Sequence, residues 1–232
     1  MIKPSDVISY LDMCHEEGVN LQRGMNFRLR SGLTVVLMSI RQGAPYADRV
    51  EDDGRVLIYE GHDVPSAQGG PDSKKVDQVA RHPGGALTQN GLFEKAALAY
   101  KCGDTEADFV KVYEKLRPGI WVYNGVFRLV DAWRERSNGR EVFKFKLQLT
   151  ENTLPSVNVP LATTIDHNRL IPTAVKLTVW KRDGGKCVKC SSTDNLHFDH
   201  IIPYSKGGSS LVAENIQLLC VRHNIAKRDS LE

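Results

Sequence analysis

Apolar and polar residues alternate in a way that predicts mostly β-strands over the first two thirds of the chain. Six short segments are apolar and rich in β-branched or aromatic residues, as strands are. They are residues 33–40, 55–59, 109–113, 120–123, 126–130 and 141–150. In the last segment, apolar residues alternate with Lys144, Lys146 and Gln148. This pattern predicts a strand with one buried face and a basic outer edge.

Apolar residues at helical spacing predict three helices. They cover residues 4–18, 87–102 and about 173–183. The first is expected to begin at Ser5 as its N-cap and to end at Gly18. Residues 151–172 contain three prolines and few charges, which is typical of a linker.

The chain therefore divides into a domain over residues 1–150, a linker over 151–172 and a second domain over 173–232. The 232 residues are enough for two modest domains with cores of their own. The net charge is only +3, so a surface that binds nucleic acid has to come from local clustering of basic residues. We find no charged-then-apolar leader and no apolar run of membrane length, and therefore expect a cytoplasmic protein without a membrane partner.

Cysteine and histidine residues near the C-terminal end are paired as in zinc sites. Cys187 and Cys190 form a Cys-x-x-Cys pair, and Cys220 and His223 form a Cys-x-x-His pair. Two such pairs supply the four ligands of one tetrahedral zinc ion. The simplest interpretation is a structural zinc module without further chemistry.

Other residues around these pairs have no place in a plain zinc module. Asp199-His200, a Gly-Gly turn and Asn215 lie between the pairs, and Asn224 follows the second. This order, from about residue 180 to 227, resembles the HNH nuclease family of the ββα-metal type. The resemblance implies that His200 is the general base, since imidazole titrates near neutral pH, and that Asn215 braces the loop and orients His200. It implies that Asp199 and Asn224 hold a catalytic Mg²⁺ or Mn²⁺, and that the four paired residues hold a structural zinc.

The strands and the helix of the first domain come in an order that resembles the SRA domain. The resemblance covers roughly residues 20–150 and depends on three motifs. They are Tyr59-Glu-Gly-His-Asp63, Asp77-Gln78 with Leu87-Thr-Gln-Asn90, and Tyr123-Asn-Gly-Val-Phe-Arg-Leu-Val-Asp-Ala-Trp133, where Asn124 replaces the Asp of the family's Tyr-Asp-Gly motif. It implies a twisted β-barrel or sheet with flanking helices. With the small HNH domain added, the expected fold class is α+β.

SRA domains bind DNA and extrude one modified base into a pocket. The resemblance places Tyr46 and Tyr59 as the two residues that stack on the base, and Asp48 as the acceptor for its exocyclic amine. Alternatively, both tyrosines are core or turn residues, and Asp48 pairs with Arg49 in solvent. Polar and basic residues of the neighbouring loops are candidates for groove contacts, although plain solvated faces explain them equally well. They are Gln22, Arg23, Asn26, Ser73, Lys74 and Lys75.

Together the two resemblances imply a modification-dependent, type IV-like restriction endonuclease. Its substrate would be double-stranded DNA with 5-methylcytosine or 5-hydroxymethylcytosine, and it would use zinc together with Mg²⁺ or Mn²⁺. One HNH site cuts one strand, so a double-strand break suggests a homodimer. Two alternatives stay open: a non-cleaving reader with a zinc-held clamp, and an HNH nuclease indifferent to modification.

Overall fold

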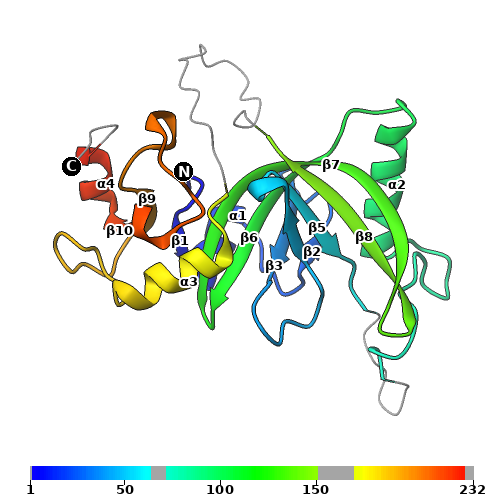
Figure 1. Ribbon diagram of the computed structural model, residues 1–232. Coiled ribbons are helices and arrows are strands. Elements are labelled where there is room, and N and C mark those ends of the chain that lie inside the picture. Colours follow the sequence, from blue (N-terminus) through cyan, green and yellow to red (C-terminus); the bar gives the residue numbers. More distant parts are fainter. Residues whose placement is uncertain (1, 64–71, 151–169, 228–232) are drawn as a thin grey trace.

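A large mixed sheet forms most of the molecule (Figure 1). The computed structural model describes residues 2–63, 72–150 and 170–227. The strands of this sheet are β1 (Val7–Ser9), β2 (Met25–Asn26), β3 (Thr34–Met38), β4 (Arg49–Glu51), β5 (Val56–Glu60), β6 (Phe109–Arg117), β7 (Ile120–Ser137) and β8 (Arg140–Leu149). Their order is β2-β3-β6-β7-β8-β5-β4, and β1 pairs with β7. Only the β3–β6 pair is parallel among the described strands.

The main core lies between this sheet and α2 (Gln89–Lys101). Thr88 caps the helix by accepting a hydrogen bond from the Gly91 N–H at 3.2 Å. Phe93 on the inner face of α2 is fully buried and contacts Phe145 of β8, with ring centroids 5.3 Å apart. The predicted helix over 87–102 is thus confirmed within two residues.

The first predicted helix begins later than expected. Residues 7–9 form β1, and α1 covers only Tyr10–Glu17. Ser9, not Ser5, is the N-cap, while Gly18 closes the helix at a φ of 66° as predicted. Ser5 lies in the left-handed region (φ 75°), and its N–H donates to the Tyr123 carbonyl at 2.7 Å. Pairing with β7 therefore overrides the helical pattern of residues 4–9.

Two predicted strands, 120–123 and 126–130, form one strand with a β-bulge. Val112 of β6 pairs with Gly125 of β7, but Tyr113 pairs with Tyr123, so Asn124 has no opposite residue. Gly125 has a φ of 102°, which glycine adopts readily. The Tyr-Asn-Gly motif is therefore the bulge, not a turn, and it redirects the Asn124 side chain out of the regular alternation.

The basic outer edge predicted for β8 is wrong at Lys144. This side chain is 1% exposed and pairs with Glu60 of β5 at 2.8 Å. Lys146 is half-buried and Gln148 is exposed. The alternation along β8 identified its two faces, but it did not reveal that loop residues 44–48 cover Lys144, whose Nζ donates to the Ala47 carbonyl at 3.1 Å.

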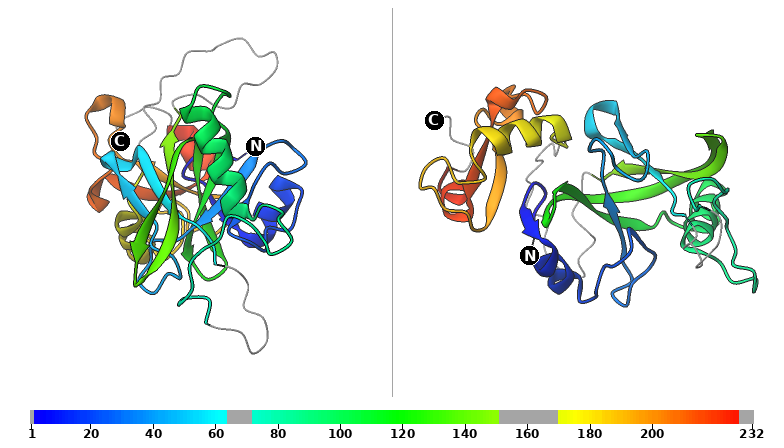
Figure 2. Two further views of the ribbon diagram at one scale, coloured as in Figure 1. Left: turned by 90° about the vertical axis from the view of Figure 1, so that its right-hand side faces the viewer. Right: turned by 90° about the horizontal axis from the view of Figure 1, so that it is seen from below.

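The C-terminal domain, described from residue 170, is a ββα unit preceded by a helix. Its elements are α3 (Thr173–Arg182), β9 (Leu196–His200), the 3₁₀ turns η2 (Tyr204–Lys206) and η3 (Ala213–Asn215), β10 (Ile216–Cys220) and α4 (Val221–Lys227). β9 and β10 form an antiparallel pair. This domain lies at one end of the molecule and α2 at the other (Figure 2). The predicted α+β class is confirmed, while residues 151–169 of the predicted linker and 64–71 of the loop after β5 lie outside the described residues.

A shared core joins the two domains. Leu116 and Val122 of the large sheet belong to the same buried cluster as Val175 of α3 and Phe198 of β9. Within the described part of the chain, no helix is both long and apolar enough to cross a membrane.

A buried polar group lies at the centre of this junction. Lys176 Nζ of α3 lies 2.7 Å from Glu114 Oε2 of β6, and both side chains are 1% exposed. Asn124, the bulge residue, donates to Glu114 at 3.0 Å and accepts from Lys176 at 2.7 Å. Thr173 also donates to Glu114. Burial by itself raises the Glu114 pKa, but Lys176 and the hydrogen bonds outweigh it and lower the pKa below its usual value.

The N-terminal segment connects the two sheets directly. β1 pairs with β7, while the Ser5 carbonyl accepts from the Phe198 N–H of β9 at 3.1 Å. Asp6 Oδ1 lies 2.7 Å from His197 Nδ1. His197 is thus a half-buried residue at the domain junction.

We expect that removing one charge of the buried Glu114–Lys176 pair destabilises the protein more than removing both. Glu114→Gln leaves the Lys176 ammonium buried without its counter-charge and should lower the free energy of unfolding by roughly 3–5 kcal/mol. Adding Lys176→Met to Glu114→Gln should recover part of this loss, because no unpaired charge remains. Urea unfolding of the three proteins measures both effects.

The control is Lys101→Met, at the exposed Lys101–Asp131 pair, where the lysine side chain is 58% exposed. Its cost should stay within about 1 kcal/mol. A Glu114→Gln cost as small as that of the control would show that the buried pair does not hold the junction.

Candidate zinc centre, nuclease site and base pocket

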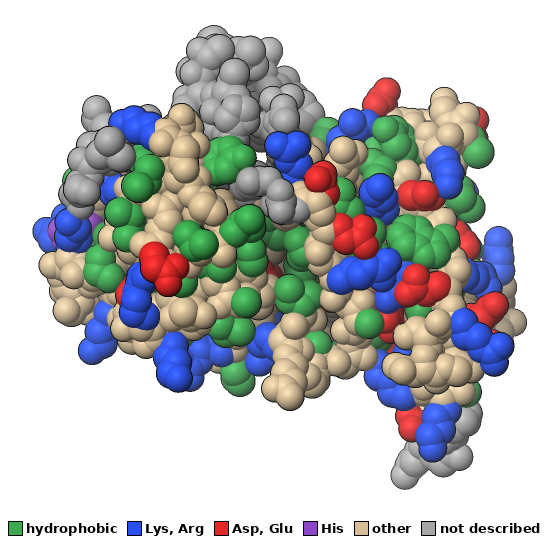
Figure 3. Space-filling model, viewed as in Figure 1, with side chains coloured by type: hydrophobic (Ala, Val, Ile, Leu, Met, Phe, Trp, Pro, Cys, Tyr) green, Lys and Arg blue, Asp and Glu red, His purple; other side chains and the backbone are tan. Residues whose placement is uncertain are grey.

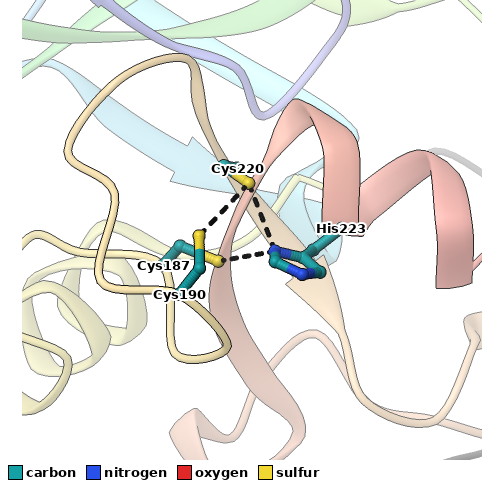
Figure 4. Close-up of side chains that lie close together, drawn as sticks. All are labelled: Cys187, Cys190, Cys220 and His223. Carbon is teal, nitrogen blue, oxygen red and sulfur yellow. Dashed lines mark hydrogen bonds between the residues drawn. The ribbon is translucent and has the colours of Figure 1, made fainter.

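The four predicted zinc ligands converge on one point (Figure 4). One ligand atom from each of Cys187, Cys190, Cys220 and His223 lies within 4.8 Å of all the others. Cys190 Sγ is 3.8 Å from Cys220 Sγ, and His223 Nδ1 is 3.3 Å from Cys220 Sγ and 3.5 Å from Cys187 Sγ. Tetrahedral zinc with ordinary bond lengths places two sulfurs about 3.8 Å apart, and a sulfur and a nitrogen about 3.6 Å apart. The residues therefore fit a zinc ion.

Local backbone geometry prepares the first ligand pair. The Ser191 N–H donates to the Cys187 carbonyl at 2.8 Å, and Ser191 has a φ of 59°, so the chain turns back on itself at the pair. Burial raises the Cys187 thiol pKa, but N–H groups of Cys220, Lys189 and Cys190 outweigh it and bring the pKa to about 6. A thiol with such a pKa is largely ionised at neutral pH, as a metal ligand must be.

His200 is the last residue of β9. Its Nε2 lies 2.8 Å from the hydroxyl oxygen of Ser210, a fully buried residue of the loop between η2 and η3. His200 pairs with Ile216 and Asp199 with Gln217, so both residues are still within the regular strand. The regular strand therefore ends only after His200.

Asn215 braces the loop that follows β9. Its side-chain carbonyl accepts from the Ile202 N–H at 2.8 Å, and its amide donates to the carbonyls of Ile202 and Ser209, both at 3.0 Å. These three bonds go to the loop backbone, whereas the His200 ring contacts the Ser210 hydroxyl. Gly208 is required in this loop, because a Cβ there would lie 1.7 Å from the Ile202 carbonyl oxygen.

The two predicted ligands of the catalytic metal lie on adjoining elements. Asp199 is on β9, and Asn224, which is half-buried, is on α4. A carboxylate and an amide oxygen are hard donors, and therefore suit Mg²⁺ or Mn²⁺. Asp199 Oδ2 is engaged by Lys227 Nζ at 2.5 Å, and the same ammonium donates to the His200 carbonyl.

The candidate base pocket is a cavity of about 540 Å³ beside Tyr46, here called the Tyr46 cavity. The residues that line it include Ile40, Arg41, Tyr46, Asp48, Glu60, Lys74 and Arg140. Tyr46 stacks on His62, with ring centroids 4.5 Å apart and planes 8° from parallel. Lys74 Nζ lies 3.9 Å from the centroid of the Tyr46 ring. A lysine and a histidine thus both contact the ring that was predicted to stack on a base.

Tyr59 does not line the Tyr46 cavity. It is 1% exposed in β5, and its hydroxyl lies 2.9 Å from His62 Nε2 and donates to the Gly24 carbonyl at 3.0 Å. Burial raises its pKa well above the usual value. The His62 ring contacts both predicted stacking residues, with its centroid 6.0 Å from that of Tyr59. Burial lowers the His62 pKa to about 4, so this ring is neutral at neutral pH.

Asp48 faces the cavity and is fixed by backbone donors. Its carboxylate accepts from the Ser39 N–H at 3.0 Å and from the Glu60 N–H at 2.9 Å. Burial raises its pKa to about 7, against the lowering effect of these two bonds. Arg49, the alternative partner considered from the sequence, pairs with Glu51 at 2.8 Å.

A network of buried charges lies beneath the Tyr46 cavity. Glu60 is paired with Lys144 at 2.8 Å, and its Oε2 accepts from the Ala47 N–H at 3.1 Å. Arg140, also buried, lies 2.6 Å from Asp63. Glu60 and Lys144 together fix the backbone of residue 47, and thus the positions of Tyr46 and Asp48.

The family relationship of the C-terminal segment is now clear. Residues 187–230 match the HNH endonuclease family. The HNH identification made from the sequence is confirmed for this segment, which includes the four zinc-type ligands, His200, Asn215 and Asn224. A comparison with curated proteins gave no match.

Comparison with solved structures returned the SUVH5 SRA domain, KRYPTONITE and SUVH9 among others. The SUVH5 SRA domain in complex with methylated CHH DNA is 21% identical, covers 66% of this chain and 92% of its own, and has a TM-score of 0.45. KRYPTONITE in complex with mCHG DNA and SAH is 18% identical, with coverage of 68% and 34% and a TM-score of 0.45. SUVH9 is 19% identical, with coverage of 66% and 29% and a TM-score of 0.40.

Sequence reasoning missed three side chains that touch these sites. Ser210 contacts His200, Lys227 contacts Asp199, and His62 separates Tyr46 from Tyr59. Lys227 could have been found, because it lies three residues after Asn224 on the same short helix, where such spacing gives one face. His62 lies within the motif that begins at Tyr59, but the motif assigns it no role, and nothing in the sequence marks Ser210.

The HNH segment should depend on its zinc. Cys190→Ala should lose the metal and unfold residues 187–227, since zinc contributes roughly 10–16 kcal/mol in comparable small domains. Elemental analysis and amide hydrogen exchange of the purified chain measure the two effects. Cys102→Ala, at an exposed cysteine after α2, is the matched control and should keep one zinc per chain. A fully active, zinc-free preparation would contradict the assignment.

Proposed function

We propose that the protein is a modification-dependent DNA endonuclease, of the kind that acts in type IV restriction. The observation that carries the nuclease assignment is the place of Asp199-His200 at the end of β9, within the segment that matches the HNH family. The assignment of modified-base recognition is supported by Tyr46 and Asp48, which line one cavity in the domain with SRA-like motifs. The substrate would be duplex DNA with 5-methylcytosine or 5-hydroxymethylcytosine.

The nuclease reaction needs a deprotonated water, positive charge near the phosphate and a proton for the leaving 3′ oxygen. His200 would take the proton from water as general base. If the Ser210 hydroxyl accepts from Nε2–H, the ring is held in one tautomer, and Nδ1 becomes the basic nitrogen. Asp199 and Asn224 would hold the Mg²⁺ or Mn²⁺, which supplies charge stabilisation at the phosphate when bound. Asn215 would hold the backbone of the loop after β9 in place beside His200.

The base-reading step would use the Tyr46 cavity. A flipped base gains stacking from an aromatic ring, and Tyr46 is the tyrosine whose ring borders the cavity. Lys74 would leave the Tyr46 ring as the base arrives, because its side chain is 42% exposed and can turn to solvent. Its ion pair with Asp63, at 2.7 Å, opposes this movement. The Asp48 carboxylate would accept from the exocyclic amine of cytosine. Tyr59 would support this arrangement from behind, through His62.

Charge on the surface is compatible with duplex binding by both domains. Lys and Arg side chains occur over the whole face in Figure 3, while Asp and Glu gather mainly over the large sheet. The alternative of an HNH nuclease indifferent to modification makes no use of the Tyr46 cavity. The alternative of a non-cleaving clamp makes no use of Asp199 and His200. A homodimer, suggested by the need to cut two strands, stays a prediction.

The proposal is tested on a duplex with one defined modified cytosine. Wild-type protein with Mg²⁺ or Mn²⁺ should cut this duplex and spare the unmodified one, as shown by mapping of both strands. His200→Ala should bind the modified duplex with the same preference but lose about 10²–10⁴-fold in cleavage rate, because it removes only the general base. Equal cutting of both duplexes favours the indifferent nuclease, and wild-type rates in His200→Ala remove the HNH mechanism.

The raised pKa of Asp48 predicts pH-dependent reading. With a pKa of about 7, the carboxylate is mostly protonated at pH 6 and mostly ionised at pH 8. If only the ionised form accepts well from the base, affinity for modified duplex should rise about tenfold between these values, in proportion to the competent fraction. Asp48→Asn should bind with a flat profile, as measured by fluorescence anisotropy.

The raised Asp48 pKa affects folding stability in the opposite direction, so the pH dependence of stability serves as a control. A carboxyl whose pKa is raised by folding favours the folded state at low pH, and this contribution is lost as the pH rises towards 7. Stronger binding at pH 8 therefore cannot result from a more stable Asp48 site. A wild-type profile that is as flat as that of Asp48→Asn would show that Asp48 does not contact the base.

A further inference from the structure

Lys227 places an ammonium on the carboxylate that would hold the catalytic cation. Its Nζ lies 2.5 Å from Asp199 Oδ2 and donates to the His200 carbonyl. The Lys227 side chain is 2% exposed and that of Asp199 is 19% exposed. The pair is thus largely shielded on the lysine side, while the carboxylate keeps some contact with solvent.

The zinc centre determines where this lysine can reach. α4 begins directly after Cys220 and carries His223, Asn224 and Lys227. Lys227 is four residues from His223 and three from Asn224, and both spacings put side chains on one helical face. A zinc bond to His223 would therefore fix the helix from which Lys227 reaches Asp199 and the His200 carbonyl at the end of β9.

A divalent cation and this ammonium compete for the same carboxylate. An ammonium without its counter-charge is strongly disfavoured in a buried position, so Lys227 stays at Asp199 as long as nothing replaces it. A second cation on Asp199 would lie within a few ångströms of the first, and the two like charges would repel each other in a medium of low dielectric constant. Binding of a metal ion by Asp199 therefore favours release of Lys227 from the carboxylate.

We propose that Lys227 is a positioning residue that exchanges partners during the reaction. It neutralises Asp199 and fixes the end of β9 before the metal ion binds, and it turns to a DNA phosphate next to His200 when Asp199 takes the ion. A lysine suits this exchange, because it carries a compact charge on a flexible stem and binds phosphate as a point charge. This inference rests on the proposed nuclease function.

The first test measures metal binding without DNA. Zinc-loaded full-length protein is titrated with Mn²⁺, and free Mn²⁺ is counted by electron paramagnetic resonance. Lys227→Met should bind Mn²⁺ at least about tenfold more tightly than wild type, since a nearby charge shifts such equilibria by one or more decades. Lys227→Arg, which keeps the charge, should resemble wild type, and so should Lys181→Met, at an exposed lysine of α3. Unchanged or weaker Mn²⁺ binding by Lys227→Met would overturn the proposal.

The second test measures the phosphate contact. In a His200→Ala background with Mn²⁺, Lys227→Met should lower the slope of log affinity against log salt by about 0.9, the value for one phosphate. Without Mn²⁺ the slope should not change, because Lys227 is still on Asp199. A lower slope under both conditions would show a permanent DNA contact and would contradict the exchange.

Two controls distinguish an effect of Lys227→Met on metal binding from a loss of folding. Zinc content and thermal unfolding of Lys227→Met show whether it is folded, and Lys227→Gln replaces it if it is not. Tighter Mn²⁺ binding by the variant, with no cleavage of any duplex by wild type, would support the exchange and overturn the endonuclease proposal. Absence of Mn²⁺ binding in all variants would overturn both.

Discussion

The buried pair of Glu114 and Lys176 determines how the two domains sit on each other. Each charge is 1% exposed, so neither is stable without the other, and the pair forms only when α3 packs on β6. Asn124 completes the group, and it can do so because the bulge at Gly125 turns its side chain out of the strand pattern. The β-bulge at Asn124 and Gly125 of β7 thereby supports the contact between the two domains.

A second chain of dependence runs from the zinc centre to the candidate catalytic residues. β9 and β10 form only a two-stranded sheet, which is too small to be stable alone. The candidate zinc ligands before β9 and at the end of β10, together with the core shared with Leu116 and Val122, would compensate for its size. If His223 binds zinc, the same bond fixes α4, from which Lys227 reaches Asp199 and the His200 carbonyl. The candidate zinc centre and the candidate nuclease site are therefore linked through α4.

The sequence reveals those parts of the structure that depend on neighbours along the chain. Spacing identified the four candidate zinc ligands, and periodicity identified α2 and five of the ten described strands. Prediction from the sequence failed where a distant segment changes the environment of a residue. Lys144 looks like a solvent-facing position of a strand, but the loop at 44–48 covers it, and residues 7–9 look helical until β7 is there to pair with them. The partners of Lys144 and Lys176 come from 84 and 62 residues away, which no local pattern shows.

The base pocket illustrates the same limit with a functional consequence. The motifs selected Tyr46 and Tyr59 as equivalent stacking residues, yet the structure gives them different surroundings. Tyr46 borders the cavity, whereas Tyr59 is a core residue that reaches it only through the His62 ring. Gly24 makes this possible, because any side chain there would collide with His62, at 2.3 Å from its Cε1. A base that stacks on Tyr46 would therefore meet a rigid support of two further rings, and its binding would not require the core around Tyr59 to open.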